Sequence, residues 1–192
     1  MINEKNFKEC SRRYNEIYKL LYRAYVDLAI VQAISAHQLT IKDRNNSFSH
    51  TISHFCLLAY QDATNVIWKL GIDDDARANT LNSLKDLIND NRKAFDIGEQ
   101  KEAIDKIRNK FLDHNDIDKS CIEDIQIGIE TLEELLLKER RYLNSLYCTK
   151  LDGQATLLTN ETIKRLNKKY KTGIDTLIEG AQLLLRVKEI TK

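Results

Sequence analysis

Apolar side chains recur at steps of three and four residues along most of the chain, which is the spacing of one face of an α-helix. The first stripe predicts a helix from about Glu4 to about Thr40, which a polar cluster at 42–47 ends. The second stripe predicts a helix from Phe48 to Leu70, and Gly71 follows where a C-terminal cap is expected. Its apolar positions are Phe48, Ile52, Phe55, Ala59, Ala63, Val66, Ile67 and Leu70.

The remaining sequence continues this pattern and predicts further helices. Asp73, Asp74 and Asp75 suit the N-terminus of a third helix, because carboxylates there meet unpaired amides and the positive end of the helix dipole. Ser120 and Glu123 form a candidate capping box for a fifth helix, and Asp152-Gly153 marks a turn before the last. The stripes of these helices are Leu81, Leu84, Leu87 and Ile88; Ile104, Ile107 and Phe111; Ile122, Ile125, Ile129, Leu132, Leu136, Leu143 and Leu146; and Ile163, Leu166, Tyr170, Ile174, Leu177, Ala181 and Leu184.

Composition favours the same fold class. The 192 residues include no proline and six glycines, and a chain that avoids both helix breakers is suited to long helices. No alternation typical of strands is sustained. We therefore predict an all-α bundle of about five to six long helices in a single domain, residues 1–192. Residues 1–150 form its predicted core, and residues 151–192 a C-terminal helix that packs on the bundle.

Charge and cysteine usage indicate which partners and which cellular compartment to expect. The net charge is +1, so any contact with nucleic acid must be local and not driven by a global field. The four cysteines fit no CxxC pattern, which favours reduced thiols, mostly in the core. The N-terminal stretch is charged and amphipathic, unlike a signal peptide, and no apolar run approaches the length of a membrane span. These features predict a cytoplasmic protein that does not contact the membrane.

The segment from Arg108 to His114 carries the most specific candidate chemistry. An arginine holds phosphate through forked charged hydrogen bonds, and a histidine moves protons near neutral pH. Asn109 and Lys110 lie between them. The same spacing recurs at Arg44 and His50, so spacing alone is not specific, but Arg44 lies in a polar linker whereas Arg108 lies inside a helical stripe.

Helix geometry limits how these two side chains meet. Six residues separate Arg108 and His114, which places them about 120° apart around a straight helix and about 9 Å apart along it. Either the helix ends before His114, or a second copy of the chain across a two-fold axis completes the site. The other interpretation is a hydrogen-bonded histidine at the core edge and a surface arginine.

The stretch from Ile107 to Asp116 resembles the signature of HEPN domains, in which arginine is followed after four to six residues by histidine. Asn109 fills the polar position that often follows the arginine. The surroundings resemble the AbiU-like branch linked to abortive phage infection, in which a helix like 59–70, with its Asn and Trp, precedes an Asp-rich turn and a Leu-rich helix. Relatives silenced by nucleotidyl transfer often carry tyrosine where this chain has Asp116, so the resemblance does not extend to that mode of control.

The resemblance implies a HEPN-like fold and a metal-independent endoribonuclease that needs no cofactor. It implies a toxin or phage-defence effector that cuts single-stranded RNA regions to 2′,3′-cyclic phosphate ends. Arg108, Asn109 and His114 would then be catalytic, and Lys110 would bind substrate. The expected partners are RNA, a second copy in a homodimer and an antitoxin protein. The alternative is a non-catalytic HEPN-like helical binding protein or antitoxin partner.

Other candidate sites have weaker support in the sequence than the segment from Arg108 to His114. His50 and His54 share one helix face near Cys56, which is a metal-ligand spacing, but no third ligand is placed and the glutamate of an HExxH site is absent. No carboxylate pair suited to acid–base chemistry is evident. Three aromatic residues fall on or near apolar stripes and are predicted to be core, namely Tyr60, Trp68 and Tyr170.

Overall fold

The computed structural model describes residues 4–37, 47–73, 75, 78–113, 127–150 and 157–190. All regular structure in these ranges is helical, so the predicted all-α bundle is confirmed. A 3-10 turn, η2 (Gly98–Gln100), precedes the fourth helix. The α-helices are α1 (Glu4–Ala36), α2 (Ser47–Gly71), α3 (Leu81–Leu87), α4 (Lys101–Asp113), α6 (Ile129–Lys150) and α7 (Asn160–Ile190).

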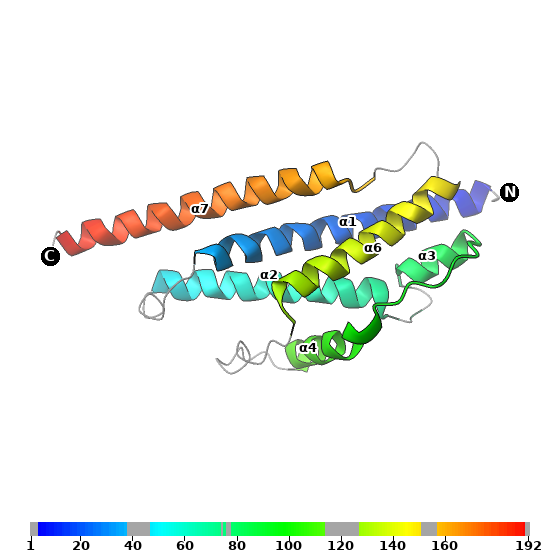
Figure 1. Ribbon diagram of the computed structural model, residues 1–192, viewed down its shortest axis with the longest axis horizontal. Coiled ribbons are helices and arrows are strands. Elements are labelled where there is room, and N and C mark those ends of the chain that lie inside the picture. The colour runs from blue at the N-terminus through cyan, green and yellow to red at the C-terminus, as the bar shows by residue number, and fades with distance from the viewer. Residues whose placement is uncertain are drawn as a thin grey trace.

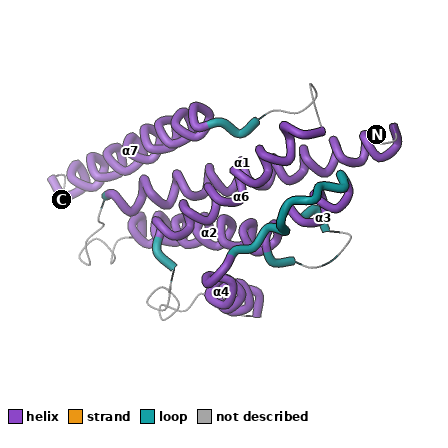
Figure 2. The backbone as a smooth tube through the Cα atoms, turned by 45° about the vertical axis from the view of Figure 1, so that its right-hand side comes forward, coloured by secondary structure: helices purple, strands orange, loops and turns teal. Residues whose placement is uncertain are grey.

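Four long helices run roughly along one axis, and a shorter helix crosses them. Figure 1 shows α2 and α6 running opposite to α1, whereas α7 runs in the same direction as α1 along its other side. In Figure 2 α4 is seen end-on while α1, α2, α6 and α7 are seen lengthwise, so α4 is steeply inclined to the bundle. The last turns of α7 extend past the neighbouring ends of α1 and α2 in both views.

The core lies where α1, α2 and α6 meet, because each of these helices turns an apolar stripe inward. On α1 the residues Tyr14, Ile17 and Leu21 are completely buried, at the predicted steps of three and four. Ile67 and Leu70 from α2, and Leu132 and Leu136 from α6, are equally inaccessible. α3, α4 and α7 close the sides of this core through Leu84, Ile104 and Leu166.

The start of α3 differs from the prediction. Thr80 is its N-cap: the Thr80 hydroxyl accepts from the Ser83 amide at 3.0 Å, and the Ser83 hydroxyl accepts from the Thr80 amide at 3.0 Å. Asp73 instead folds the preceding turn, where its carboxylate accepts from the Asp75 amide. The assignment of the aspartates to this N-terminus is therefore wrong, because a reciprocal hydroxyl pair satisfies the same orphan amides.

Three positions of the predicted stripes are wrong. Phe55 is 57% exposed whereas Leu57 is buried, and Leu177 is exposed whereas Ile178 is fully buried. Leu184, on the overhanging end of α7, is 67% exposed. At Leu177 and Ile178 both residues are apolar, and steps of three and of four both satisfy a helical period of 3.6, so the pattern leaves the choice between them open. The predicted capping pair Ser120 and Glu123, and the turn at 152–153, lie outside the described residues.

Gly71 closes α2 for a different reason from the predicted one. It is the last helical residue and does not adopt the left-handed conformation of a C-terminal cap. A Cβ atom at this position would lie 2.8 Å from two side-chain carbons of Ile97 and 3.0 Å from the Phe95 ring. Gly71 is therefore required by the close approach of the segment 95–97, and the capping prediction is wrong.

We expect Gly71→Ala to lower the free energy of unfolding by about 1–2 kcal/mol, because the overlap outweighs the better helix propensity of alanine. Gly173→Ala is the matched control, since nothing lies within 4 Å of a Cβ at that helical glycine. The control should stabilise by about 0.5–1 kcal/mol. Urea unfolding monitored by circular dichroism measures both changes, and a stabilising Gly71→Ala would contradict this packing.

The predictions about membrane spans and cysteines can be compared with the described residues. None of the described helices has the length and apolar character that a membrane crossing requires. Cys10 is a buried free thiol and Cys56 a half-buried one, in agreement with reduced cysteines at these two positions. Burial raises the pKa of the Cys56 thiol above its ordinary value.

Candidate functional site around Arg108

Arg108 lies near the C-terminal end of α4, on the side that faces α2. Ile104 and Ile107 are buried, and Arg108 at the next position is half-buried. Arg108 therefore lies at the edge of the buried stripe of α4. The helix begins after the turn η2 and carries Glu102 in its first turn, as its dipole favours.

The guanidinium of Arg108 stacks on an aromatic ring from another helix. Its central carbon lies 3.7 Å from the centroid of the Trp68 ring, which belongs to α2. The indole N–H of Trp68 donates to the Asp105 carboxylate at 2.6 Å, and Asp105 is one turn before Arg108 on α4. These contacts join Trp68, Asp105 and Arg108 into one cluster that bridges α2 and α4.

The cluster orients the guanidinium of Arg108 against the Trp68 ring. A guanidinium that packs over an aromatic ring donates its hydrogen bonds within its own plane and not toward the ring. The hydrogen bond from Trp68 to Asp105 holds the ring, and the ring holds Arg108. Such an arrangement presents a planar cation to an anion in one orientation, as forked phosphate binding requires.

The other predicted site residues are described only in part. Asn109 and Lys110 belong to the backbone of α4, and their side chains are not among the described ones. His114 and Asp116 lie outside the described residues, which resume at Ile127. The structure therefore places Arg108 and does not show how His114 is arranged relative to it.

Trp68 is the residue whose role the sequence patterns missed. It is partly buried and packs against the core, as predicted for an aromatic residue on the stripe. Its ring face, however, is occupied by a cation, and its N–H by a carboxylate. The only local signal was an acidic and a basic residue one turn apart on an amphipathic helix, which does not name the aromatic partner.

A carboxylate pair that the sequence analysis did not find joins α1 to α2. Arg23 forms ion pairs with Asp62 and with Asp27, the latter at 4.0 Å. Burial and, to a lesser extent, the nearby charge of Asp62 raise the pKa of Asp27 to about 6, against the opposing effect of Arg23. Asp27 and Asp62 are 35 positions apart and meet only once the helices pack, so no local spacing indicates this pair.

Two charged residues of α6 lie inside the hydrophobic core of the bundle. Glu139 is completely inaccessible, and neither carboxylate oxygen has a hydrogen-bond partner. Burial raises the pKa of Glu139 well above its ordinary value. The neighbouring Arg140 is 6% exposed, donates to Asn160 at the start of α7 at 2.5 Å and faces the Tyr25 ring. Arg140 thus ties α6 to α7 and α1.

The rival metal site has no support from the described side chains. His50 and His54 are both exposed on α2. Among the residues that the structure describes, no group of three or more His, Cys, Asp or Glu side chains is placed to hold a metal ion. The pair is therefore an exposed feature of one helix face.

No protein-family model, no curated protein and no solved structure matches this chain. The function proposed below therefore rests on the cluster of Trp68, Asp105 and Arg108 and on the sequence motif from Arg108 to His114.

Proposed function

We propose that the protein is a metal-independent endoribonuclease of HEPN type that acts in phage defence or as a toxin. The observation that carries the proposal is the stacking of Arg108 on Trp68 at 3.7 Å, at the end of the helix that leads into the motif histidine. The rival interpretation of Arg108 as a solvated surface arginine fits this contact poorly, because the side chain is half-buried and oriented by another helix.

The proposed chemistry divides between Arg108 and His114. Arg108 binds the scissile phosphate and stabilises the negative charge that develops on its oxygens. His114 takes the proton of the ribose 2′-hydroxyl, or gives a proton to the leaving 5′-oxygen. Attack of the 2′-oxygen on phosphorus, with departure of the 5′-oxygen, leaves a 2′,3′-cyclic phosphate and a 5′-hydroxyl. Asn109 and Lys110 are assigned to orienting and binding the phosphate.

A two-fold dimer would supply the second proton-transfer group. One histidine would act as base and its copy from the partner as acid, which agrees with the separation of about 9 Å between residues six apart on one helix. Unpaired RNA is the expected substrate, because the 2′-oxygen must align with the leaving oxygen and a regular helix prevents this.

The test is cleavage of a mixed tRNA and ribosomal RNA pool by the purified chain in EDTA. Wild-type protein should release fragments with cyclic-phosphate ends, whereas His114→Ala should not. His50→Ala is the matched control: His50 follows Arg44 at the same spacing, and we expect full activity from this variant. Equal cleavage by wild type and His114→Ala would refute the proposal. Absence of cleavage by both would favour the non-catalytic helical binding protein.

A further inference from the structure

Exposed leucines and glycines alternate along the outer side of α7. They recur at steps of four, three and four, namely Gly173, Leu177, Gly180 and Leu184. Leu177 is 51% exposed and Leu184 is 67% exposed, and both glycines are exposed as well. Such steps keep residues on one face of a helix, so the four form a strip about 16 Å long, which we call the α7 strip. Leu183, also exposed, borders it.

The packing of α7 on the bundle leaves the α7 strip uncovered. Ile178 is completely buried although Leu177 beside it is exposed, so the buried side of this helix lies next to the strip and not on it. A Cβ atom built on Gly173 or on Gly180 would meet nothing within 4 Å. Contacts within the described part of the chain therefore explain neither the small residues nor the large ones of the strip.

Charged residues of α7 lie away from the strip. Between 173 and 184 they are Asp175 and Glu179, which the helical period places about 100° or more around the axis from Gly180. Asp175 contacts His37 at the end of α1 at 2.8 Å and accepts from Lys171 at 2.6 Å. An uncharged apolar strip favours an apolar partner and offers no cation to a nucleic-acid backbone.

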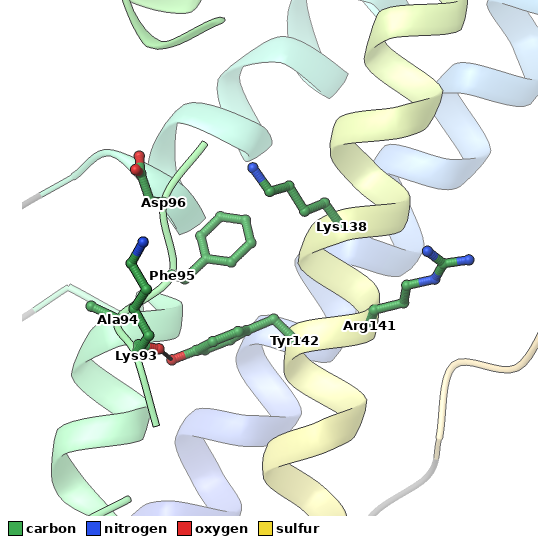
Figure 3. A pocket seen from close by; sticks show the side chains of 7 residues that line it. All are labelled: Lys93, Ala94, Phe95, Asp96, Lys138, Arg141 and Tyr142. Atoms are coloured by element: carbon green, nitrogen blue, oxygen red, sulfur yellow. Dashed lines mark hydrogen bonds between the residues drawn. The ribbon is translucent and has the colours of Figure 1, made fainter. Parts of the chain in front are cut away.

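Apolar side chains at the edge of α6 are, by contrast, covered by the chain itself. Figure 3 shows Phe95 and Tyr142 close together between the segment 93–96 and α6, with Arg141 directed away from them. The two rings meet edge to face at 5.2 Å, and the Tyr142 hydroxyl donates to the Lys93 carbonyl at 3.0 Å. Phe95 is buried. These rings need no partner, whereas the leucines of α7 gain from one.

The order of large and small residues indicates what covers the α7 strip. Suppose that two copies lie antiparallel around a two-fold axis between residues 178 and 179. Leu177 then faces the partner's Gly180, and Leu184 faces the partner's Gly173. Every leucine meets a glycine, as knobs fit into holes. A parallel pair in register would place leucine on leucine and glycine on glycine, which leaves gaps.

We propose that α7 pairs with α7 of a second copy of this chain, in antiparallel orientation, through the α7 strip. The steps of four, three and four read the same in both directions, so a two-fold contact satisfies all four positions at once. Glycine allows the two helix backbones to approach closely. The interface is short compared with those of permanent dimers, so the association is weak and reversible.

This contact is separate from the site proposed around Arg108. Figures 1 and 2 both show α7 and α4 on opposite sides of the bundle. Pairing through α7 therefore does not bring two Arg108 side chains together, and it differs from the two-fold dimer considered for cleavage. The proposal does not rest on ribonuclease activity, and its test requires none.

The test is sedimentation velocity of the full chain from about 5 to about 500 µM. Wild-type association should rise with concentration, and Gly180→Leu should weaken it at least about 10-fold, because the added side chain meets the partner's Leu177. The folded monomer has room for this side chain, since a Cβ there meets nothing. Lys164→Leu is the matched control: it adds a leucine at an exposed position about 160° around α7 and should not weaken association.

The exchange Leu177→Gly, Gly180→Leu distinguishes pairing from general stickiness. Its composition is that of the wild type, and the two-fold pairs are again leucine with glycine, so association should return to nearly the wild-type strength. The proposal is overturned if wild type stays monomeric, if the exchange fails to restore association, or if Gly180→Leu associates as well as wild type, which an unspecific apolar surface or a contact elsewhere would give. Circular dichroism verifies folding. If the exchange loses helix, Leu177→Ala decides: it should weaken association, and an unchanged dimer would exclude the strip.

Discussion

Replacing Arg108 with alanine should lower the rate of RNA cleavage by about 10²–10³-fold, because one preorganised donor to developing phosphate charge is worth this much. The effect should fall on kcat and much less on KM, since the rest of the RNA-binding surface remains. Arg108→Lys should recover little of the lost rate. A lysine keeps the charge but neither stacks flat on Trp68 nor offers two parallel donors.

Lys106→Ala is the matched control on the same helix. Lys106 pairs with Glu102 on the exposed side of α4 and should be dispensable. Single-turnover rates measure the chemical step directly, and circular dichroism verifies that each variant folds. If Arg108→Ala cleaved as fast as Lys106→Ala, Arg108 would have no part in the chemistry, and the stacked cluster would be a structural link between α2 and α4.

Replacing Glu139 with glutamine should raise the free energy of unfolding by roughly 2–4 kcal/mol at pH 7.5 and have little effect near pH 4. The folded protein keeps the Glu139 proton because the side chain is fully buried, which raises its pKa. The unfolded chain releases that proton above about pH 4.5. Stability from this group is therefore highest at acid pH and falls by about 1.4 kcal/mol per pH unit above it.

Urea unfolding of wild type and Glu139→Gln across this pH range measures the difference. Glu134→Gln, five residues earlier on the exposed side of α6, removes the same charge and should give no pH-dependent difference. The two curves for position 139 should converge as the pH falls. A difference that stayed constant with pH would show that Glu139 is ionised in the folded protein and would contradict its placement.

The periodic stripes predicted the helices well because burial of an apolar face is what stabilises each of them. They predicted positions less well where the residue type conflicts with its place. Glu139 and Arg140 occupy the core stripe between Leu136 and Leu143, so the spacing marks them as buried while their charge suggests exposure. No local pattern shows that Asn160 and Tyr25 face Arg140 from other helices.

The sequence predicted Arg108 of the candidate site but not its aromatic partner. The motif identified Arg108, whose place on the stripe edge follows from the helical period. Its partner Trp68 lies 40 positions earlier, and only the packing of α4 against α2 brings the ring under the guanidinium. Gly71 was likewise singled out correctly and explained wrongly, because the atoms that exclude a side chain there belong to a later segment.

Trp68 is the single tryptophan of this chain, and it lies at the candidate site itself. Intrinsic tryptophan fluorescence therefore originates from one indole, with a cation on its face and a carboxylate on its N–H. An anion that draws the guanidinium away from the ring changes the emission of the whole protein. The molecule thus contains its own optical reporter of ligand binding at Arg108, which needs no label and no catalytic turnover.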